Sequence, residues 1–172
     1  MFLTLAAALA LLPQQIEDPL APAREGKLMC VSPNTEAKTC SGLVTYSFEA
    51  DGAIVTEART AVSAAPPIVL LTRTPMHMRG ALECSRTDDF ASQITGVEIQ
   101  GQALAGDQLN GMRQIIGAQA QQMLGTGEMC AAYHSAADDK VRYEITMEGV
   151  AKPELGGEIL WIDANAGWTV AI

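Results

Sequence analysis

The sequence lacks most of the short motifs that mark nucleotide, metal or nucleophile chemistry. It contains no GxGxxG, no P-loop and no HExxH, which removes the common dinucleotide, triphosphate and metalloprotease sites. The GxSxG turn that exposes a serine nucleophile is missing, and no acidic pair has the DxDxDG spacing of a calcium loop. We therefore predict no catalytic residues and no cofactor.

Basic residues are also scarce. The chain has 11 Lys and Arg against 20 Asp and Glu, a formal charge of −9 at pH 7. Such a charge repels the phosphates of nucleic acids and of anionic lipid headgroups. Nucleic acid is therefore not an expected partner.

An apolar run over residues 1–12, ending at Pro13, has the length of a signal-peptide core and is too short to span about 30 Å of hydrocarbon. No basic residue precedes it, and a buried N-terminal helix is the alternative. Small residues at 8–10 and at 21–23 both suit a signal peptidase, and the sequence does not choose between them. We expect a flexible lead over 13–27 that contains the cleavage site, and no stable membrane anchor once the signal is removed.

Four cysteines, Cys30, Cys40, Cys84 and Cys130, indicate an exported, oxidised protein, in the periplasm or secreted. They allow three connectivities. The ten-residue offset favours a local bridge from Cys30 to Cys40, which leaves Cys84 with Cys130. Neither pair has the CxxC spacing of a redox or zinc site, so we interpret both as structural disulfides.

Apolar and polar residues alternate in two runs of strands. Asp51-Gly52 supplies the positive-φ pair of a two-residue turn between strands at 44–48 and 54–62. Further strands are expected over 68–71 running on to 75–78, then at 81–84, 129–133, 141–147, 159–162 and 168–172, the last two as a closing hairpin. Because the strands come in runs with helices between the runs, residues 28–172 are predicted to form a single α+β domain with an antiparallel sheet.

A short helix is predicted from Thr87 to Gly96, with the Thr87 hydroxyl as its N-cap. A longer helix is predicted from Asp107 to Gly125, with an apolar stripe along one face. Gly111 and Gly117 inside it each cost about 1 kcal/mol relative to Ala, so packing must stabilise this helix.

Met76-His77-Met78 offers the thioether and imidazole ligands that suit cuprous copper. On a strand, however, His77 points away from the face that Met76 and Met78 share. A copper site would therefore need His134 or another methionine to reach that face. We predict that the methionines fill gaps in the core and that no metal is bound.

The two histidines also define an enzyme alternative, a small hydrolase that uses His134 or His77. It requires a carboxylate and a nucleophile within hydrogen-bond reach of the histidine in a cleft. Ser135 follows His134 directly, but sequence neighbours do not by themselves make a triad. We predict that the protein is not an enzyme.

Trp161 and Trp168 flank the predicted closing turn and could form a binding platform or seal the end of a core. With its paired cysteines, the turn at Asp51-Gly52 and the closing Trp161-Ile162 and Gly167-Trp168, the chain resembles small uncharacterised exported proteins of Gram-negative bacteria. That resemblance implies a fold and a compartment but no activity.

From the residues we predict a non-catalytic periplasmic or secreted module that binds a partner protein or a small apolar ligand. The ligand would occupy a cavity between sheet and helix, which the small residues along 106–125 could leave open.

Overall fold

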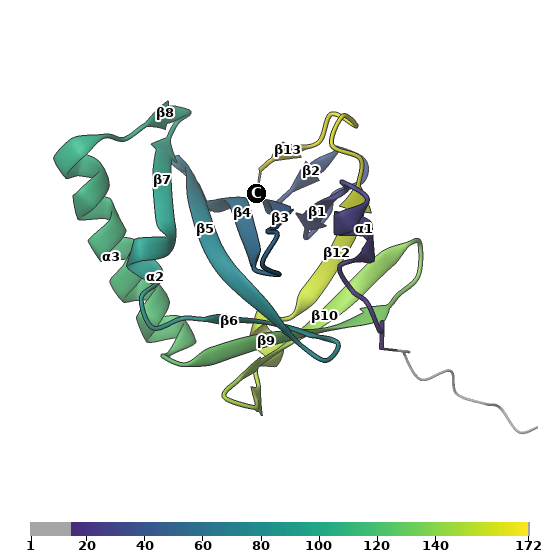
Figure 1. The fold of residues 1–172 in the computed structure, drawn as a ribbon. Helices are drawn as coiled ribbons and strands as arrows, with labels where there is room; N and C mark the ends of the chain where they lie inside the picture. Colours follow the sequence, from purple (N-terminus) through teal and green to yellow (C-terminus); the bar gives the residue numbers. More distant parts are fainter. Residues whose placement is uncertain (1–14, 172) are drawn as a thin grey trace, which may run out of the picture.

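Eight antiparallel strands close into a barrel in the computed structural model, which describes residues 15–171 (Figure 1). The barrel strands follow one another around the ring in chain order: β1 (Leu28–Val31), β3 (Gly42–Phe48), β4 (Ile54–Ala64), β5 (Pro67–Arg79), β6 (Leu82–Arg86), β9 (Glu128–Ser135), β10 (Lys140–Met147) and β12 (Gly157–Ile162). The predicted signal-peptide core at 1–12 lies outside the described residues, as do residues 13, 14 and 172.

The predicted α+β class is wrong, because the sheet closes on itself and the protein is mostly β. Closure depends on β1, whose Met29 lies opposite Trp161 of β12 on one side and Val44 of β3 on the other. The predicted hairpin between 159–162 and 168–172 does not form. Instead, β13 (Thr169–Val170) pairs in parallel with β2 (Thr39–Cys40), which leaves β12 free to complete the barrel.

Strand β5 joins the barrel to a smaller extension. One of its edges pairs with β4 along most of its length. The other edge is divided, since residues 68–72 pair with β7 (Ile94–Ile99) and residues 77–79 pair with β6. Pro75 lies between these two partners, on a stretch of edge that neither of them occupies, which suits a residue without an N–H. A short strand, β8 (Gln102–Ala103), pairs antiparallel with β7 at the edge of this extension.

The extension is covered by helix α3 (Gly106–Leu124), which lies to one side of the molecule against β7 and the first half of β5 (Figure 1). The predicted long helix is therefore confirmed, and it ends at Gly125 as expected. Gly117 allows α2 (Phe90–Gln93) to approach closely, because a Cβ at this position would lie 2.6 Å from that of Ala91. Gly111 faces open space.

The short helix predicted over 87–96 shrinks to the four residues of α2. Thr87 is buried and its hydroxyl donates to the carbonyl oxygens of Gly125 and Gly127 at 3.1 and 3.2 Å, so it fixes the end of α3 rather than capping α2. The remaining elements are α1 (Ala21–Arg24), a 3₁₀ turn η1 (Pro153–Leu155) and β11 (Val150–Ala151). Within residues 15–171, no helix combines the length and the hydropathy needed to cross a membrane.

Both predicted disulfides are confirmed. Cys30 and Cys40 link β1 to β2, and Cys84 and Cys130 lie directly opposite each other on β6 and β9. Structural disulfides persist in oxidising compartments and are rare in reducing ones. The protein therefore belongs in an oxidising environment.

Candidate functional site

The interior of the barrel holds a cavity of about 240 Å³. All eight barrel strands contribute to its wall, because alternate residues of each strand point inward. The wall is mainly apolar, with a few hydroxyl groups and one carboxyl group. It is lined by Met29, Val31, Val44, Tyr46, Thr56, Ala58, Thr72, Thr74, Met76, Glu83, Ser85, Met129, Ala131, Tyr133, Tyr143, Ile145 and Ile159.

Glu83 supplies the carboxyl group, and it is only 4% exposed. It points inward from β6 together with Ser85, while Cys84 between them points outward to its disulfide. The Tyr133 hydroxyl donates to Glu83 Oε2, whereas Glu83 Oε1 is buried with no hydrogen-bond partner among residues 15–171. Burial raises the pKa of Glu83, and the hydroxyls of Tyr133 and Tyr46 offset part of that rise.

Two tyrosines stand beside this carboxyl group. Burial, followed by the charge of Glu83, raises the pKa of both Tyr46 and Tyr133, so both stay protonated and act as donors. The Tyr46 hydroxyl also lies 3.7 Å from Met29 Sδ. The ring centroid of Tyr143 is 6.4 Å from that of Tyr133, which places a third phenol ring in the wall.

The segment before β1 closes one end of the barrel. Leu20 is fully buried and packs together with Ala23. Their contacts lie next to the β3–β4 and β5–β6 turns and on β12, and they are Tyr46, Ile54, Met76, Met78 and Trp161. The Ile16 N–H donates to the Tyr133 carbonyl oxygen at 2.9 Å. The sequence predicts a flexible lead here, but from Gln15 onward the chain lies against the barrel, because its few apolar side chains fill this opening.

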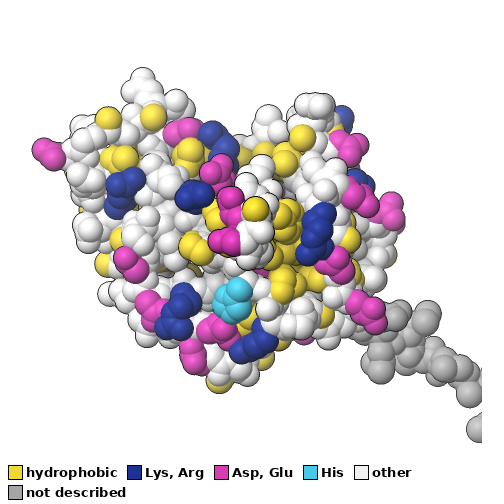
Figure 2. Space-filling model, in the orientation of Figure 1, with side chains coloured by type: hydrophobic (Ala, Val, Ile, Leu, Met, Phe, Trp, Pro, Cys, Tyr) yellow, Lys and Arg dark blue, Asp and Glu magenta, His cyan; other side chains and the backbone are white. Residues whose placement is uncertain are grey.

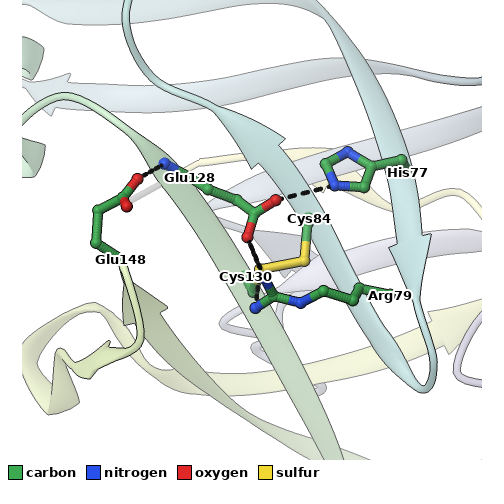
Figure 3. Close-up of a disulfide and its surroundings, with 6 residues drawn as sticks. All are labelled: His77, Arg79, Cys84, Glu128, Cys130 and Glu148. Carbon is green, nitrogen blue, oxygen red and sulfur yellow. Dashed lines mark hydrogen bonds and ion pairs between the residues drawn. A yellow bond between two sulfur atoms is a disulfide. The ribbon is translucent and has the colours of Figure 1, made fainter.

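The outer face of the barrel carries a second cluster of functional groups, around the Cys84–Cys130 disulfide (Figure 3). Glu128 Oε1 lies 3.1 Å from His77 Nε2, within hydrogen-bond distance, and Glu128 Oε2 accepts a hydrogen bond from Arg79 Nη1 at 2.5 Å. His77, Cys84 and Glu128 bring potential metal-ligand atoms within 4.8 Å of one another. The sulfur of Cys84 is bonded in the disulfide, however, so it offers no thiolate, and only the exposed His77 and the half-buried Glu128 remain as potential ligands.

The candidate copper ligands do not meet. Met76 and Met78 pack against Leu20 at the closed end of the barrel, and His77 points outward, as strand alternation requires. His134 follows the inward-facing Tyr133, so it lies on the outer face, where its Nε2 is 3.7 Å from Glu144 Oε2. Among the described residues, neither histidine has a hydroxyl or a free thiol as a hydrogen-bond partner.

The two tryptophans are separated as well. Trp161 packs on Tyr46, with ring centroids 5.9 Å apart, whereas Trp168 packs beside the Cys30–Cys40 disulfide. They form no shared platform, because the strand that contains Trp161 pairs with β1 and β10. Figure 2 shows one face of the molecule, on which acidic and basic side chains are interspersed with apolar ones.

The region where the sequence places a cavity, between sheet and helix, contains an open apolar groove of about 630 Å³. It runs between α3 and the continuation of β4 and β5, and its members include Val62, Ile115 and Met123, all exposed. Thr72 lines both this groove and the barrel cavity. The groove contains the polar side chains of Thr60, Ser63 and Gln119 but no charged residue, whereas the barrel cavity contains the carboxyl group of Glu83.

Sequence reasoning missed Glu83, Tyr46 and Tyr133 as a group. The alternation over 129–133 correctly predicts that Tyr133 points inward, but Leu82 and Cys84 are the apolar residues of their strand and suggest that Glu83 points outward. The available signal was the disulfide, because a bridge between two neighbouring barrel strands turns both sulfurs to the outer face and the residues beside them to the inner one.

Comparison of the chain with models of protein families, with curated proteins and with solved structures finds no match.

Proposed function

We propose that this protein is a non-catalytic binding module, periplasmic or secreted, that takes one small, mainly apolar ligand into its barrel. The observation that carries the proposal is the hollow interior, a cavity of about 240 Å³ lined by residues of all eight barrel strands. Eight-stranded barrels have room either for their own side chains or for one small ligand. Here threonine, serine and alanine stand at inward positions where larger side chains would fill the space.

The size of the cavity limits the ligand. A cavity of about 150 Å³ accepts benzene, so the larger space here fits about ten non-hydrogen atoms, a single ring with a short chain. At an intermediate efficiency of about 0.6 kcal/mol per atom, such a ligand would gain about 6 kcal/mol, which corresponds to a Kd in the tens of micromolar. A large or extended lipid would not fit.

The disulfides support the compartment. Both are buried, and together they link β1 to β2 and β6 to β9, so the barrel that holds the cavity depends on oxidising conditions. A periplasmic or secreted binding module meets this requirement.

The test is a titration with 2-phenylethanol, a neutral probe of about the right size, followed by amide NMR shifts of β6 and β9. Saturable shifts are expected in the wild-type protein. Ala131 points into the cavity from β9, and Ala131→Phe should fill the space and abolish those shifts. Ala132→Phe, the same change on the outer face one residue later, should leave binding intact.

Two results would contradict the proposal: no saturable shifts in the wild-type protein, or equal binding by Ala131→Phe and the wild-type protein. Ala131→Leu is a milder filling variant, and its binding should fall between those of the wild-type protein and Ala131→Phe. Circular dichroism of each variant shows whether the barrel is retained.

A further inference from the structure

We infer that the ligand is a small organic cation, an apolar body with one protonated amine whose N–H groups meet Glu83 Oε1. This inference rests on the proposed function, since it names the chemical class of ligand for the same cavity. It is carried by a different observation, the unpaired oxygen of a buried carboxyl group.

The unpaired oxygen calls for a donor from outside the chain. The Tyr133 hydroxyl donates to Oε2 and the Tyr46 hydroxyl donates to Met29 Sδ, so Oε1 has no hydrogen-bond partner among residues 15–171. Buried polar atoms in folded proteins nearly always have a partner, and an unpaired one needs an explanation, such as a catalytic role or a bound molecule. Because Glu83 is part of the cavity wall, a molecule in the cavity is placed to supply that donor.

The charge of the wall favours a cation over a neutral molecule or an anion. Among the described residues of the wall, none is Lys, Arg or His, and Glu83 is the only acidic one. An anionic ligand would meet Glu83 with no compensating positive charge. A neutral ligand without a donor would leave Oε1 unpaired, whereas an ammonium group would pair the oxygen and balance the charge in surroundings of low dielectric constant.

The rest of the wall suits the same ligand. Three phenol rings, those of Tyr46, Tyr133 and Tyr143, belong to the wall, and the face of an aromatic ring attracts cations. The methionine sulfurs and aliphatic side chains of the other strands provide the surface for the apolar body. The ligand class is thus an arylalkyl or short alkyl amine.

The same arrangement makes binding depend on pH. The other titratable groups facing the cavity are the three tyrosines, from β3, β9 and β10, and the strands β1, β4, β5 and β12 bring none to the wall. Because the pKa of Glu83 is raised and an alkylamine stays protonated to about pH 10, affinity for the amine should fall as the pH drops through the pKa of Glu83. Affinity for a neutral probe should not change.

The experiment compares three probes that share a phenylethyl group, by calorimetry and NMR: 2-phenylethylamine, 2-phenylethanol and the slightly larger 3-phenylpropanoate. The wild-type protein should bind the amine at least tenfold more tightly than the alcohol, and the carboxylate most weakly. Glu83→Gln keeps the size of the side chain and should remove the preference for the amine while leaving affinity for the alcohol within about twofold. Glu57→Gln removes the same charge from an exposed position outside the cavity and should change nothing.

The outcomes separate this inference from the proposed function. Equal binding of amine and alcohol by the wild-type protein, or an unchanged preference in Glu83→Gln, overturns the inference that the ligand is a cation. The cavity would then remain a site for a neutral ligand. Absence of binding by all three probes overturns both. If Glu83→Gln does not fold, the pH dependence of the wild-type protein decides, because a Kd for the amine that does not vary with pH also overturns the inference.

Discussion

Replacing Glu83 with Gln should stabilise the ligand-free protein at neutral pH. In the folded protein Glu83 Oε1 is buried without a partner, which costs about 1–3 kcal/mol relative to exposure to water. Gln retains an oxygen to accept the Tyr133 hydroxyl and removes the charge from the apolar interior. The amide N–H groups of Gln then take the place of Oε1 as a buried group without a partner, so the substitution removes only the cost of the charge. We therefore expect the free energy of unfolding to rise by up to about 3 kcal/mol where Glu83 is ionised.

The sign of the pH dependence follows from the raised pKa. Between the ordinary value of 4.5 and the raised value, the folded state holds a proton that the unfolded state has released. Stability therefore falls as pH rises through this window, and the cost of the buried charge disappears below it. The difference between Glu83→Gln and the wild-type protein should be smallest below pH 4.5 and should grow as the pH rises through the raised pKa of Glu83.

Urea unfolding of both proteins, followed by circular dichroism from about pH 4 to about pH 8, measures this difference directly. Glu57→Gln, which changes an exposed carboxyl group, serves as the control and should follow the wild-type protein. The reasoning would be refuted if Glu83→Gln were less stable than the wild-type protein by the same amount at every pH. That result would mean that the carboxyl group holds the barrel together.

Three further predictions concern the packing of the extension and the covalent and apolar contacts that hold the barrel. Gly117→Ala should destabilise the protein despite the better helix propensity of Ala, because the added methyl group meets α2, whereas Gly111→Ala should stabilise it by about 1 kcal/mol; thermal unfolding compares the two. Leu20→Ala should cost about 3 kcal/mol in urea unfolding, and an unchanged stability would show that the segment before β1 does not seal the barrel. Replacing Cys84 and Cys130 together with Ser should cost about 4 kcal/mol, because the disulfide closes a loop of 46 residues, and a loss under 1 kcal/mol would contradict this.

Local features of the fold were predictable because their causes lie close together in the sequence. The expected hairpin forms around Asp51-Gly52, although only Gly52 has a positive φ, of 88°, and the strands are joined by residues 49–53 rather than by a two-residue turn. The apolar stripe after Asp107 produces α3, and the ten-residue spacing of Cys30 and Cys40 produces the first disulfide. In each case a few neighbouring residues determine the geometry.

The closure of the barrel was not predictable in the same way. It depends on the pairing of β1 with β12, which come from opposite ends of the chain, and a strand's own alternation does not specify its partner. Trp161 illustrates the problem, because its spacing from Trp168 suggests a local hairpin while its actual partner across the sheet is Met29. Once the barrel is missed, its interior is missed with it.

The grouping of Glu83 with Tyr133 could not be predicted from the sequence for a related reason. Glu83 is one of 20 acidic residues, and the only local mark is its neighbour Cys84, whose disulfide indicates a face only once the barrel is known. Its role emerges only when β6 takes its place between β5 and β9 and turns Glu83 toward Tyr133. Partners that lie 50 residues apart are brought together by the sheet rather than by any local pattern.

The central claim is that Glu83 is a buried carboxyl group whose Oε1 has no hydrogen-bond partner among residues 15–171 and binds the ammonium group of a cationic ligand. The most direct test is the side-chain carboxyl ¹³C shift of Glu83, titrated with pH in the protein alone and in the presence of 2-phenylethylamine. We predict a pKa above 4.5 in the free protein and a clear decrease when the amine is bound. An ordinary pKa in the free protein, or one that the amine leaves unchanged, would contradict the account.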